Sequence, residues 1–266
     1  MILTTEQMTR WHEDGFLHLR SFGPSDSTFS DWTDELYSWP ETAGKWMKYF
    51  EPSVDGSNQR QLCRIEHFLE YHEQWKQTIE SPILYQILEQ LFGEPAVLFK
   101  EKINFKLPHG NGFSAHQDAP AFTSFGQRFH ITAMLSIDAS NQQNGCLEMA
   151  KGGHKRGLLK MTESLVITDE VVQSLEWEPV ETSPGDLLLF GSLIPHRSGP
   201  NSSAHPRRAA YITYNPKSSG SHRHAYYQRK RETFPPEIER IPGRDYSNSG
   251  VFNVGNPIAP AVSSDT

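Results

Sequence analysis

The sequence has 266 residues, of which 36% are hydrophobic and 21% are charged, and its formal net charge is -7. This length allows one domain with a substantial core, and the negative charge argues against nonspecific nucleic-acid binding. The sequence contains no run of about 18 apolar residues, so we expect no membrane-spanning helix.

The first part of the chain predicts mainly helices. A capping-box pattern begins a helix that ends at Gly15, and a short strand follows at residues 16–19. Residues 25–40 have a weaker helical pattern. A clearer helix, with Ser and Pro at its start and an apolar face, covers residues 81–93. We therefore expect an N-terminal helical region over about residues 1–95.

From residue 96 onward, the pattern changes to short strands separated by turns rich in Gly, Pro and Asn. The predicted strands are residues 97–106, 129–138, 185–190 and 209–215. Helices followed by a long β section favour a mainly β fold with flanking helices and a sandwich or jelly-roll core. We expect a single domain over residues 1–266, with the β core at about 96–216 and a C-terminal covering segment at 217–260.

The cysteines and the first residues bear on location. Cys63 and Cys146 are the only cysteines and have no CxxC spacing, which is typical of reduced thiols in an intracellular protein. The first residues lack a basic flank followed by an apolar core, so we expect no signal peptide and a cytoplasmic location.

Three residues have the types and spacing of a metal site. His116 and Asp118 are two residues apart, so on a regular strand their side chains point to the same face, and His196 follows much later. Two imidazoles and one carboxylate can occupy one side of an octahedral metal and leave three positions open, as in non-haem Fe(II) oxygenases. The alternative is three unrelated polar residues at a loop edge.

An arginine follows the last of these residues at a useful distance. Arg207 lies eleven residues beyond His196. Its planar guanidinium can form a bidentate contact with the carboxylate of a keto-acid cosubstrate. We expect Arg208 to point to the opposite face, although a one-residue slip would exchange the two. The alternative is two solvated arginines at the start of a strand.

Further motifs resemble the phytanoyl-CoA dioxygenase family of Fe(II)/2-oxoglutarate oxygenases. They are Asp14-Gly15-Phe16, Asn144-Gly145-Cys146-Leu147, Gly153-His154-Lys155 and Pro184-Gly185-Asp186, in the order that the family has around His116, Asp118, His196 and Arg207. The resemblance covers nearly the whole chain. It implies a double-stranded β-helix core of the jelly-roll, cupin-like type. It also implies one Fe(II) on the two histidines and the aspartate, and 2-oxoglutarate as cosubstrate.

The resemblance also implies roles around the cosubstrate. Ser198 matches a position where the family often places a hydroxyl on the same carboxylate as Arg207. Asn104 resembles a position that hydrogen-bonds the cosubstrate, and Lys102 shares its strand face and could supply another cation. Phe113 could form an apolar wall. For these last three residues, a place on the sheet surface or in the core is an equal alternative.

The implied reaction is the hydroxylation, or another oxidation, of an unactivated C–H bond in a small molecule, with O2 consumed and succinate and CO2 as co-products. Related halogenases replace the acid with a small residue, so Asp118 favours oxygenation or desaturation over halogenation. The alternative class is a cupin-type metal-dependent isomerase or a non-catalytic small-molecule binder. We expect no nucleic-acid partner, and a monomer or a homodimer.

Two segments are candidates for the walls of the substrate pocket. Residues 119–128 follow the His116 motif and carry aromatic and polar side chains, and residues 226–231 carry two tyrosines and three cations. These cations could favour a small anionic substrate, or they could form a solvated basic face. Candidate substrates are an aminoalkylphosphonate, suggested by a faint resemblance to bacterial enzymes, and a secondary metabolite.

Overall fold

The computed structural model describes residues 2–53, 57, 59–246, 252 and 254. Its α-helices are α1 (Thr5–Asp14), α2 (Thr28–Ser38), α3 (Glu73–Ile79), α4 (Pro82–Phe92), α5 (Ala119–Phe122), α6 (Asp169–Gln173) and α7 (Arg223–Thr233). Its strands are β1 (Phe16–Leu19), β2 (Met47–Pro52), β3 (Arg60–Glu66), β4 (Ala96–Lys106), β5 (Phe113–His116), β6 (Ile131–Ser136), β7 (Leu147–Ala150), β8 (Trp177–Val180), β9 (Leu187–Gly191), β10 (His196–Ser198) and β11 (Arg207–Pro216). Short 3-10 turns include η1 (Thr123–Phe125).

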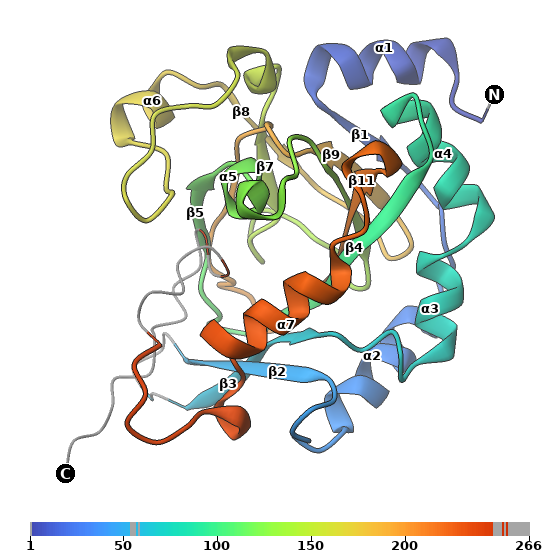
Figure 1. Cartoon of the computed structure of the whole chain (residues 1–266). Helices are drawn as coiled ribbons and strands as arrows, with labels where there is room; N and C mark the ends of the chain where they lie inside the picture. Colours follow the sequence, from blue (N-terminus) through green and yellow to red (C-terminus); the bar gives the residue numbers. More distant parts are fainter. Residues whose placement is uncertain (1, 54–56, 58, 247–251, 253, 255–266) are drawn as a thin grey trace.

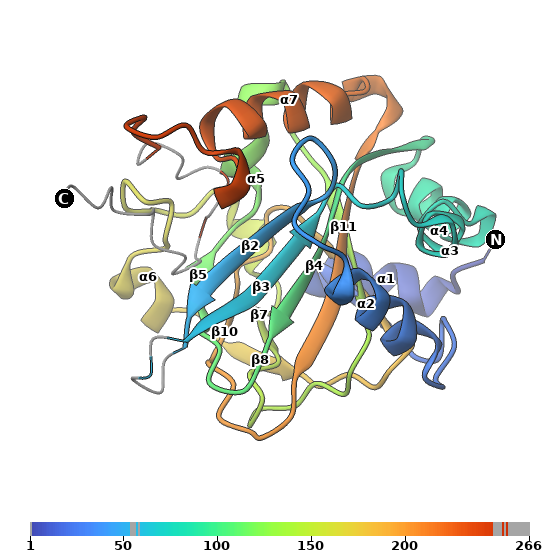
Figure 2. The same ribbon diagram turned by 90° about the horizontal axis from the view of Figure 1, so that it is seen from below.

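Two antiparallel sheets form the core of the fold. Within the described residues, the larger sheet has the order β1-β9-β6-β11-β4-β3-β2 and the smaller one the order β5-β10-β7-β8. Figure 2 shows β2, β3, β4 and β11 side by side. Apolar side chains from both sheets, such as Met134 and Phe190 on one and Leu147 and Met149 on the other, meet in one cluster. This packing makes a jelly-roll of the double-stranded β-helix type and confirms the predicted fold class.

The N-terminal helices cover the outer face of the larger sheet. Trp11 of α1, Phe29 of α2, Trp75 of α3 and Leu88 of α4 lie in one buried cluster with outward-facing strand residues such as Ile103. Figure 1 shows these helices gathered along one flank of the molecule. Because the helices bury the outer face, the inner face of the sheet remains free to line a pocket. None of the described helices combines the length and the apolar character that crossing a membrane requires.

Helix α7 runs across one end of the larger sheet, beside the ends of β2, β3 and β4 (Figure 2). Its residues Tyr226 and Tyr227 pack with Phe99 of β4 and with Phe122 and Phe125 of the α5–η1 segment. This aromatic cluster closes one end of the space between the two sheets.

The strand predicted at residues 16–19 is present as β1, but the region before residue 96 also contains β2 and β3, which the sequence analysis did not predict. Strand β2 pairs with β3, and β3 pairs with β4, so both extend the larger sheet. Charged residues such as Lys48, Arg64 and Glu66 are buried in these strands, so they do not show the usual alternation of apolar and solvated positions. The division of the chain at residues 95 and 216 stays a prediction, and 247–251, 253 and 255–260 of the covering segment lie outside the described residues.

Two helix-ending glycines give a matched test of local packing. Gly15 and Gly93 both have positive φ, at 85° and 75°, and each donates its N–H to the end of its helix. A Cβ on Gly15 would lie 2.3 Å from Nδ1 of His154, whereas one on Gly93 would meet nothing within 4 Å.

We therefore expect Gly93→Ala to cost about 1 kcal/mol of unfolding free energy, from the left-handed backbone alone. Gly15→Ala should cost about 1–3 kcal/mol more, because the methyl group also displaces the imidazole. Urea unfolding of both variants measures the difference, and equal losses would show that the contact with His154 does not constrain the α1–β1 turn.

Candidate active site

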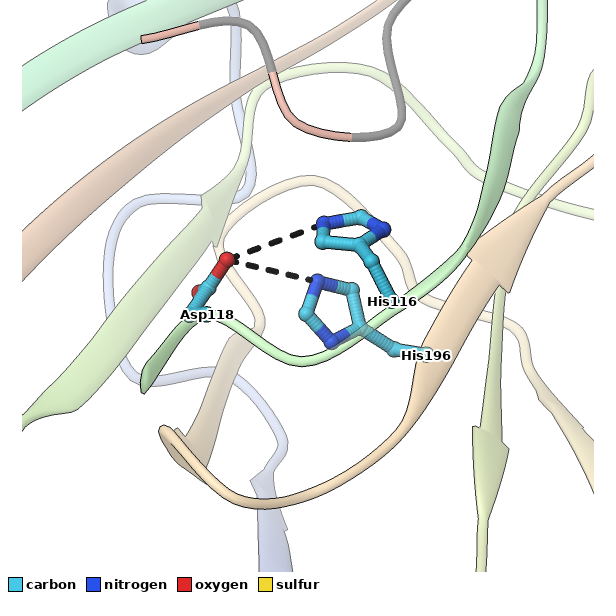
Figure 3. Close-up of side chains that lie close together, drawn as sticks. All are labelled: His116, Asp118 and His196. Atoms are coloured by element: carbon cyan, nitrogen blue, oxygen red, sulfur yellow. Dashed lines mark ion pairs between the residues drawn. The ribbon is translucent and has the colours of Figure 1, made fainter. Parts of the chain in front are cut away.

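Two histidines and one aspartate come together at the edge of the smaller sheet. Strands β5 and β10 pair with His116 directly opposite His196. Nε2 of His116 lies 3.6 Å from Oδ1 of Asp118, and Nε2 of His196 lies 3.9 Å from the same oxygen. Figure 3 shows both imidazoles turned toward this carboxylate. The three potential ligand atoms all lie within 4.8 Å of one another, which is compatible with one shared metal ion.

Asp118 reaches this position by a different route from the one predicted. Strand β5 ends at His116, and Asp118 has φ -75° and ψ -25° immediately before α5. The expectation that both residues lie on one regular strand is therefore wrong, because the chain turns between them. The side chain of Gln117 anchors this turn: it donates to the carbonyls of Leu193 and Gly157 and accepts from the N–H of Leu159. Gln117 therefore has a structural role in this turn.

Hydrogen bonds orient the imidazoles of His116 and His196 so that each can donate a lone pair to a metal ion. Nδ1 of His116 lies 2.7 Å from the carbonyl of Ser114, and Nδ1 of His196 lies 3.1 Å from the carbonyl of Ile194. A carbonyl only accepts, so each Nδ1 carries the proton and each Nε2 presents its lone pair to the centre of the cluster. Burial lowers the pKa of His116 to about 3, so its ring is neutral near pH 7. Burial raises the pKa of Asp118, but the neighbouring imidazoles of His196 and His116 outweigh it, and the net shift is downward. The donor set fits a divalent cation such as Fe(II).

Arg207 and Arg208 point to opposite faces of β11, as expected from alternation. Arg207 is 3% exposed and faces inward, where it donates to the hydroxyls of Ser140 and Tyr211. Among the described residues it has no carboxylate partner. Arg208 faces outward and forms ion pairs with Asp138 and Asp34. Arg207 is thus available to bind an anion, while Arg208 links helix α2 to the sheet through its ion pair with Asp34.

Lys106, which the sequence analysis did not single out, lies beside Arg207. The two residues are paired across β4 and β11. Nζ of Lys106 donates to Oγ of Ser198 at 2.8 Å and lies 5.8 Å from the ring centroid of Phe113. Burial and the adjacent Arg207 lower the pKa of Lys106 to about 6. A bound anion would raise this pKa again and keep Lys106 charged, so these two neighbouring buried side chains form a natural anion site.

The signal for Lys106 was present in the sequence. Lys100, Lys102, Asn104 and Lys106 alternate along β4 and therefore share one face. Such a row is normally read as a solvated strand face. Here Lys100, Asn104 and Lys106 are buried, Lys102 is half-buried, and the row is turned toward the interior of the jelly-roll.

The pocket that contains the His116–Asp118–His196 cluster is lined by further cations. Arg64, Lys100, Lys102 and Asn104 all face it, together with Phe113. Burial, followed by the proximity of Arg64 and Lys100, holds the pKa of Lys102 well below its usual value. Among the described residues, Nε of Arg64 and Oδ1 of Asn104 are buried without a hydrogen-bond partner. The cavity is therefore lined by several basic side chains and has unused hydrogen-bonding capacity.

The two segments expected at the mouth of the pocket meet there, as helices rather than loops. Phe122 and Tyr226 both line the cavity, and their ring centroids are 6.1 Å apart. The cations of the second segment do not line it. Lys230 pairs with Glu66, and Arg231 pairs with Glu239. The basic side chains of the pocket come from β3 and β4 instead. Of the two interpretations of residues 226–231, contact with an anionic substrate is therefore wrong, and a solvated face does not hold for Lys230, which is buried.

Comparison with known proteins places these observations in context. The family model for phytanoyl-CoA dioxygenase (PhyH) matches residues 11–209. The chain is 51% identical over 258 residues to the 2-aminoethylphosphonate dioxygenase of an uncultured bacterium, covering 96% of this chain and 98% of that protein. It is 40% identical over 234 residues to the methylphosphonate hydroxylase of Gimesia maris, covering 87% of this chain and 88% of that protein.

A solved structure shares the fold. The crystal structure of EctD from S. alaskensis with 2-oxoglutarate and 5-hydroxyectoine matches with a TM-score of 0.70 at 19% identity, covering 82% of this chain and 78% of that one. At this identity the match establishes the common fold.

Proposed function

This chain belongs to the phytanoyl-CoA dioxygenase family, and we propose that its substrate is a small organophosphonate. It is a 2-oxoglutarate-dependent dioxygenase that uses Fe(II). The observation that carries the proposal is the surplus of buried cations around the His116–Asp118–His196 cluster. A neutral substrate would leave that charge uncompensated. The names of the two relatives reported above both contain a phosphonate, the chemical class that such a pocket suits.

We assign His116, Asp118 and His196 as the residues that hold Fe(II). Their neutral imidazoles and ionised carboxylate match the charge and the ligand preference of this ion. Fe(II) and 2-oxoglutarate, when bound, supply the activation of O2, and the overall reaction converts a C–H bond to C–OH while 2-oxoglutarate becomes succinate and CO2. The carbonyls of Ser114 and Ile194 fix the orientation of both histidines, so the protein supplies a rigid ligand set.

The cosubstrate carboxylate is assigned to Arg207 and Ser198, with Lys106 as an additional cation. Arg207 retains donors beyond those used on Ser140 and Tyr211, and Lys106 already contacts the Ser198 hydroxyl. A carboxylate here would balance two adjacent buried cations. Phe113, Asn104 and Lys102 stay predictions as cosubstrate contacts, and all three line the cavity.

The aromatic cluster that contains Phe122 has a testable role in coupling the consumption of 2-oxoglutarate to the oxidation of the substrate. Phe122 is 5% exposed and faces the cavity, where it can exclude water from a reactive intermediate. We expect Phe122→Ala to consume 2-oxoglutarate while forming less substrate product, so that the ratio of succinate to product rises. Parallel assays of succinate and product give this ratio.

Phe125→Ala is the matched control, because Phe125 packs in the same cluster and is not among the cavity-lining residues. It should lower thermal stability while the ratio stays near that of the unmodified enzyme. If both variants merely lose stability, Phe122 only packs the domain.

Several finer points are also proposals. We propose O2 as the co-oxidant, a cytoplasmic location and a monomeric or homodimeric state. Cys63 and Cys146 are both buried and free, which agrees with a reducing compartment. A secondary metabolite remains the second substrate candidate, and the charge of the pocket favours the phosphonate. The isomerase and non-catalytic alternatives are not supported, because the chain belongs to a dioxygenase family.

The substrate class is tested by substrate-dependent succinate release. The enzyme with Fe(II), 2-oxoglutarate and O2 should release succinate faster with 2-aminoethylphosphonate or methylphosphonate than with the corresponding carboxylates. Stimulation by carboxylates alone would exclude a phosphonate substrate.

A further inference from the structure

We propose that Arg64, Lys100 and Lys102 form a second anion-binding subsite that holds the phosphonate group of the substrate, separate from the carboxylate subsite at Arg207. This inference rests on the proposed function and assigns the recognition of the substrate to particular side chains.

Strand register places the three cations on one surface. Arg64 of β3 lies opposite Asn104 of β4, and Glu66 lies opposite Lys102. Positions two apart on a strand share a face, so Lys100, Lys102 and Arg64 all project toward the interior of the jelly-roll. They line the same cavity as Asp118. A molecule bound to them therefore lies next to the proposed metal site.

The two lysines of this surface have no direct anionic partner among the described residues. Within the described part of the chain, the ammonium groups of Lys100 and Lys102 make no hydrogen bond and no ion pair. Nζ of Lys100 lies 5.0 Å from the ring centroid of Phe122, and Nζ of Lys102 lies 5.3 Å from that of Tyr211. Buried ammonium groups against aromatic rings gain some cation–π attraction, but they lose the solvation that water or an anion would supply.

The neighbouring carboxylate is already engaged. Both oxygens of Glu66 accept from Nζ of Lys230 at 2.7 Å. Nη1 of Arg64 reaches Glu66 only at 3.4 Å, and its Nε has no partner among the described residues. Glu101, which also acts on Lys100, is paired with Arg223, and Asp118 is assigned to the metal. The cations of this surface therefore outnumber the carboxylates near them. A doubly charged anion would reduce this imbalance and use the free Arg64 donor.

The second subsite lies further along β4 than the first. Lys106, which contacts Ser198, and Lys100 are six residues apart on β4, a span of about 20 Å along a strand. The backbone of Lys100 is therefore well removed from the Arg207 end, to which the cosubstrate carboxylate is assigned. Lys102 lies between the two ends and can contact either anion. Strand β4 therefore presents Lys106 to the 2-oxoglutarate carboxylate and Lys100 to the phosphonate, with the metal site nearby.

The shape of the anion also matters. A phosphonate has three oxygens and up to two negative charges, so it can accept from a guanidinium and from two ammonium groups at once. A carboxylate has two coplanar oxygens and one charge. The subsite should therefore prefer phosphonates to carboxylates of the same length.

The test uses 2-aminoethylphosphonate as the probe and calorimetric titration as the readout, with anaerobic Fe(II)-loaded enzyme that holds 2-oxoglutarate. Lys100→Gln and Arg64→Gln should each weaken phosphonate binding by at least about tenfold, the scale expected for loss of a buried charge-assisted contact. Their affinity for 2-oxoglutarate should stay within about twofold, while Arg207→Ala should show the opposite pattern. Lys217→Gln, an exposed lysine outside the cavity, should change neither affinity.

The outcomes separate this inference from the proposed function. If the unmodified enzyme neither binds nor oxidises a phosphonate, the proposed function fails and the inference fails with it. If it does both, but Lys100→Gln and Arg64→Gln bind the phosphonate as tightly as before, only the subsite assignment is overturned. Weakened binding of 2-oxoglutarate in Lys100→Gln would also overturn it, because the cation would then serve the cosubstrate. Melting temperatures verify that each variant is folded.

Discussion

Asp118→Ala is expected to abolish both iron binding and turnover. Asp118 supplies the only carboxylate of the His116–Asp118–His196 cluster, and its Oδ1 faces both imidazoles. Without it, two neutral nitrogens must hold a divalent cation. Loss of groups that only orient metal ligands already costs about 10–100-fold in affinity, so loss of a ligand should exceed about 100-fold. Iron content after anaerobic loading and desalting, measured with succinate release, gives both effects.

Asp169→Ala is the control, since Asp169 is an exposed acid at the start of α6. It should bind iron and turn over normally. Full product formation by Asp118→Ala, without added carboxylate, would rule out the proposed ligand set.

Arg207→Ala is expected to raise the 2-oxoglutarate concentration needed for half-maximal rate by more than about tenfold. The guanidinium is buried and, within the described part of the chain, donates only to two hydroxyls, so it can bind a carboxylate at little cost in existing contacts. Removing it leaves that carboxylate facing Lys106 and Ser198 alone. Titration of 2-oxoglutarate at saturating iron measures the change.

Arg208→Ala provides a control on the adjacent residue. Arg208 pairs with Asp138 and Asp34 on the outer face, so its loss should cost about 2–3 kcal/mol of unfolding free energy while leaving 2-oxoglutarate affinity unchanged. If Arg208→Ala instead loses cosubstrate affinity and Arg207→Ala does not, the cosubstrate lies on the other face of β11.

Local signals predicted the elements whose structure is decided locally. The capping box at Thr4, the left-handed Gly15 and the proline at the start of α4 each act within one turn of helix, and the structure has helices at these places. Strands β2 and β3 were missed because their charged residues are buried by partners distant in sequence. Glu66, for example, is paired with Lys230 of α7.

In the candidate site, too, the sequence predicted what depends on local pattern and missed what depends on residues distant in sequence. The types and order of His116, Asp118 and His196 suggested a common site, although Asp118 arrives through a turn rather than along a strand. The row of cations on β4 looked like a solvated face, because a sequence does not show which strand face the second sheet encloses. Conversely, the sequence left Lys230 open as a substrate contact, but its ammonium group forms a buried ion pair with Glu66.

The most direct test of the account is a reaction with dioxygen labelled with oxygen-18, 2-oxoglutarate and 2-aminoethylphosphonate, followed by mass spectrometry. The account predicts one labelled oxygen atom in succinate and a phosphonate product that gains one oxygen atom, with succinate and product formed in equal amounts. Labelled succinate with an unchanged phosphonate would contradict the proposed substrate. No succinate under any of these conditions would contradict the oxygenase assignment itself.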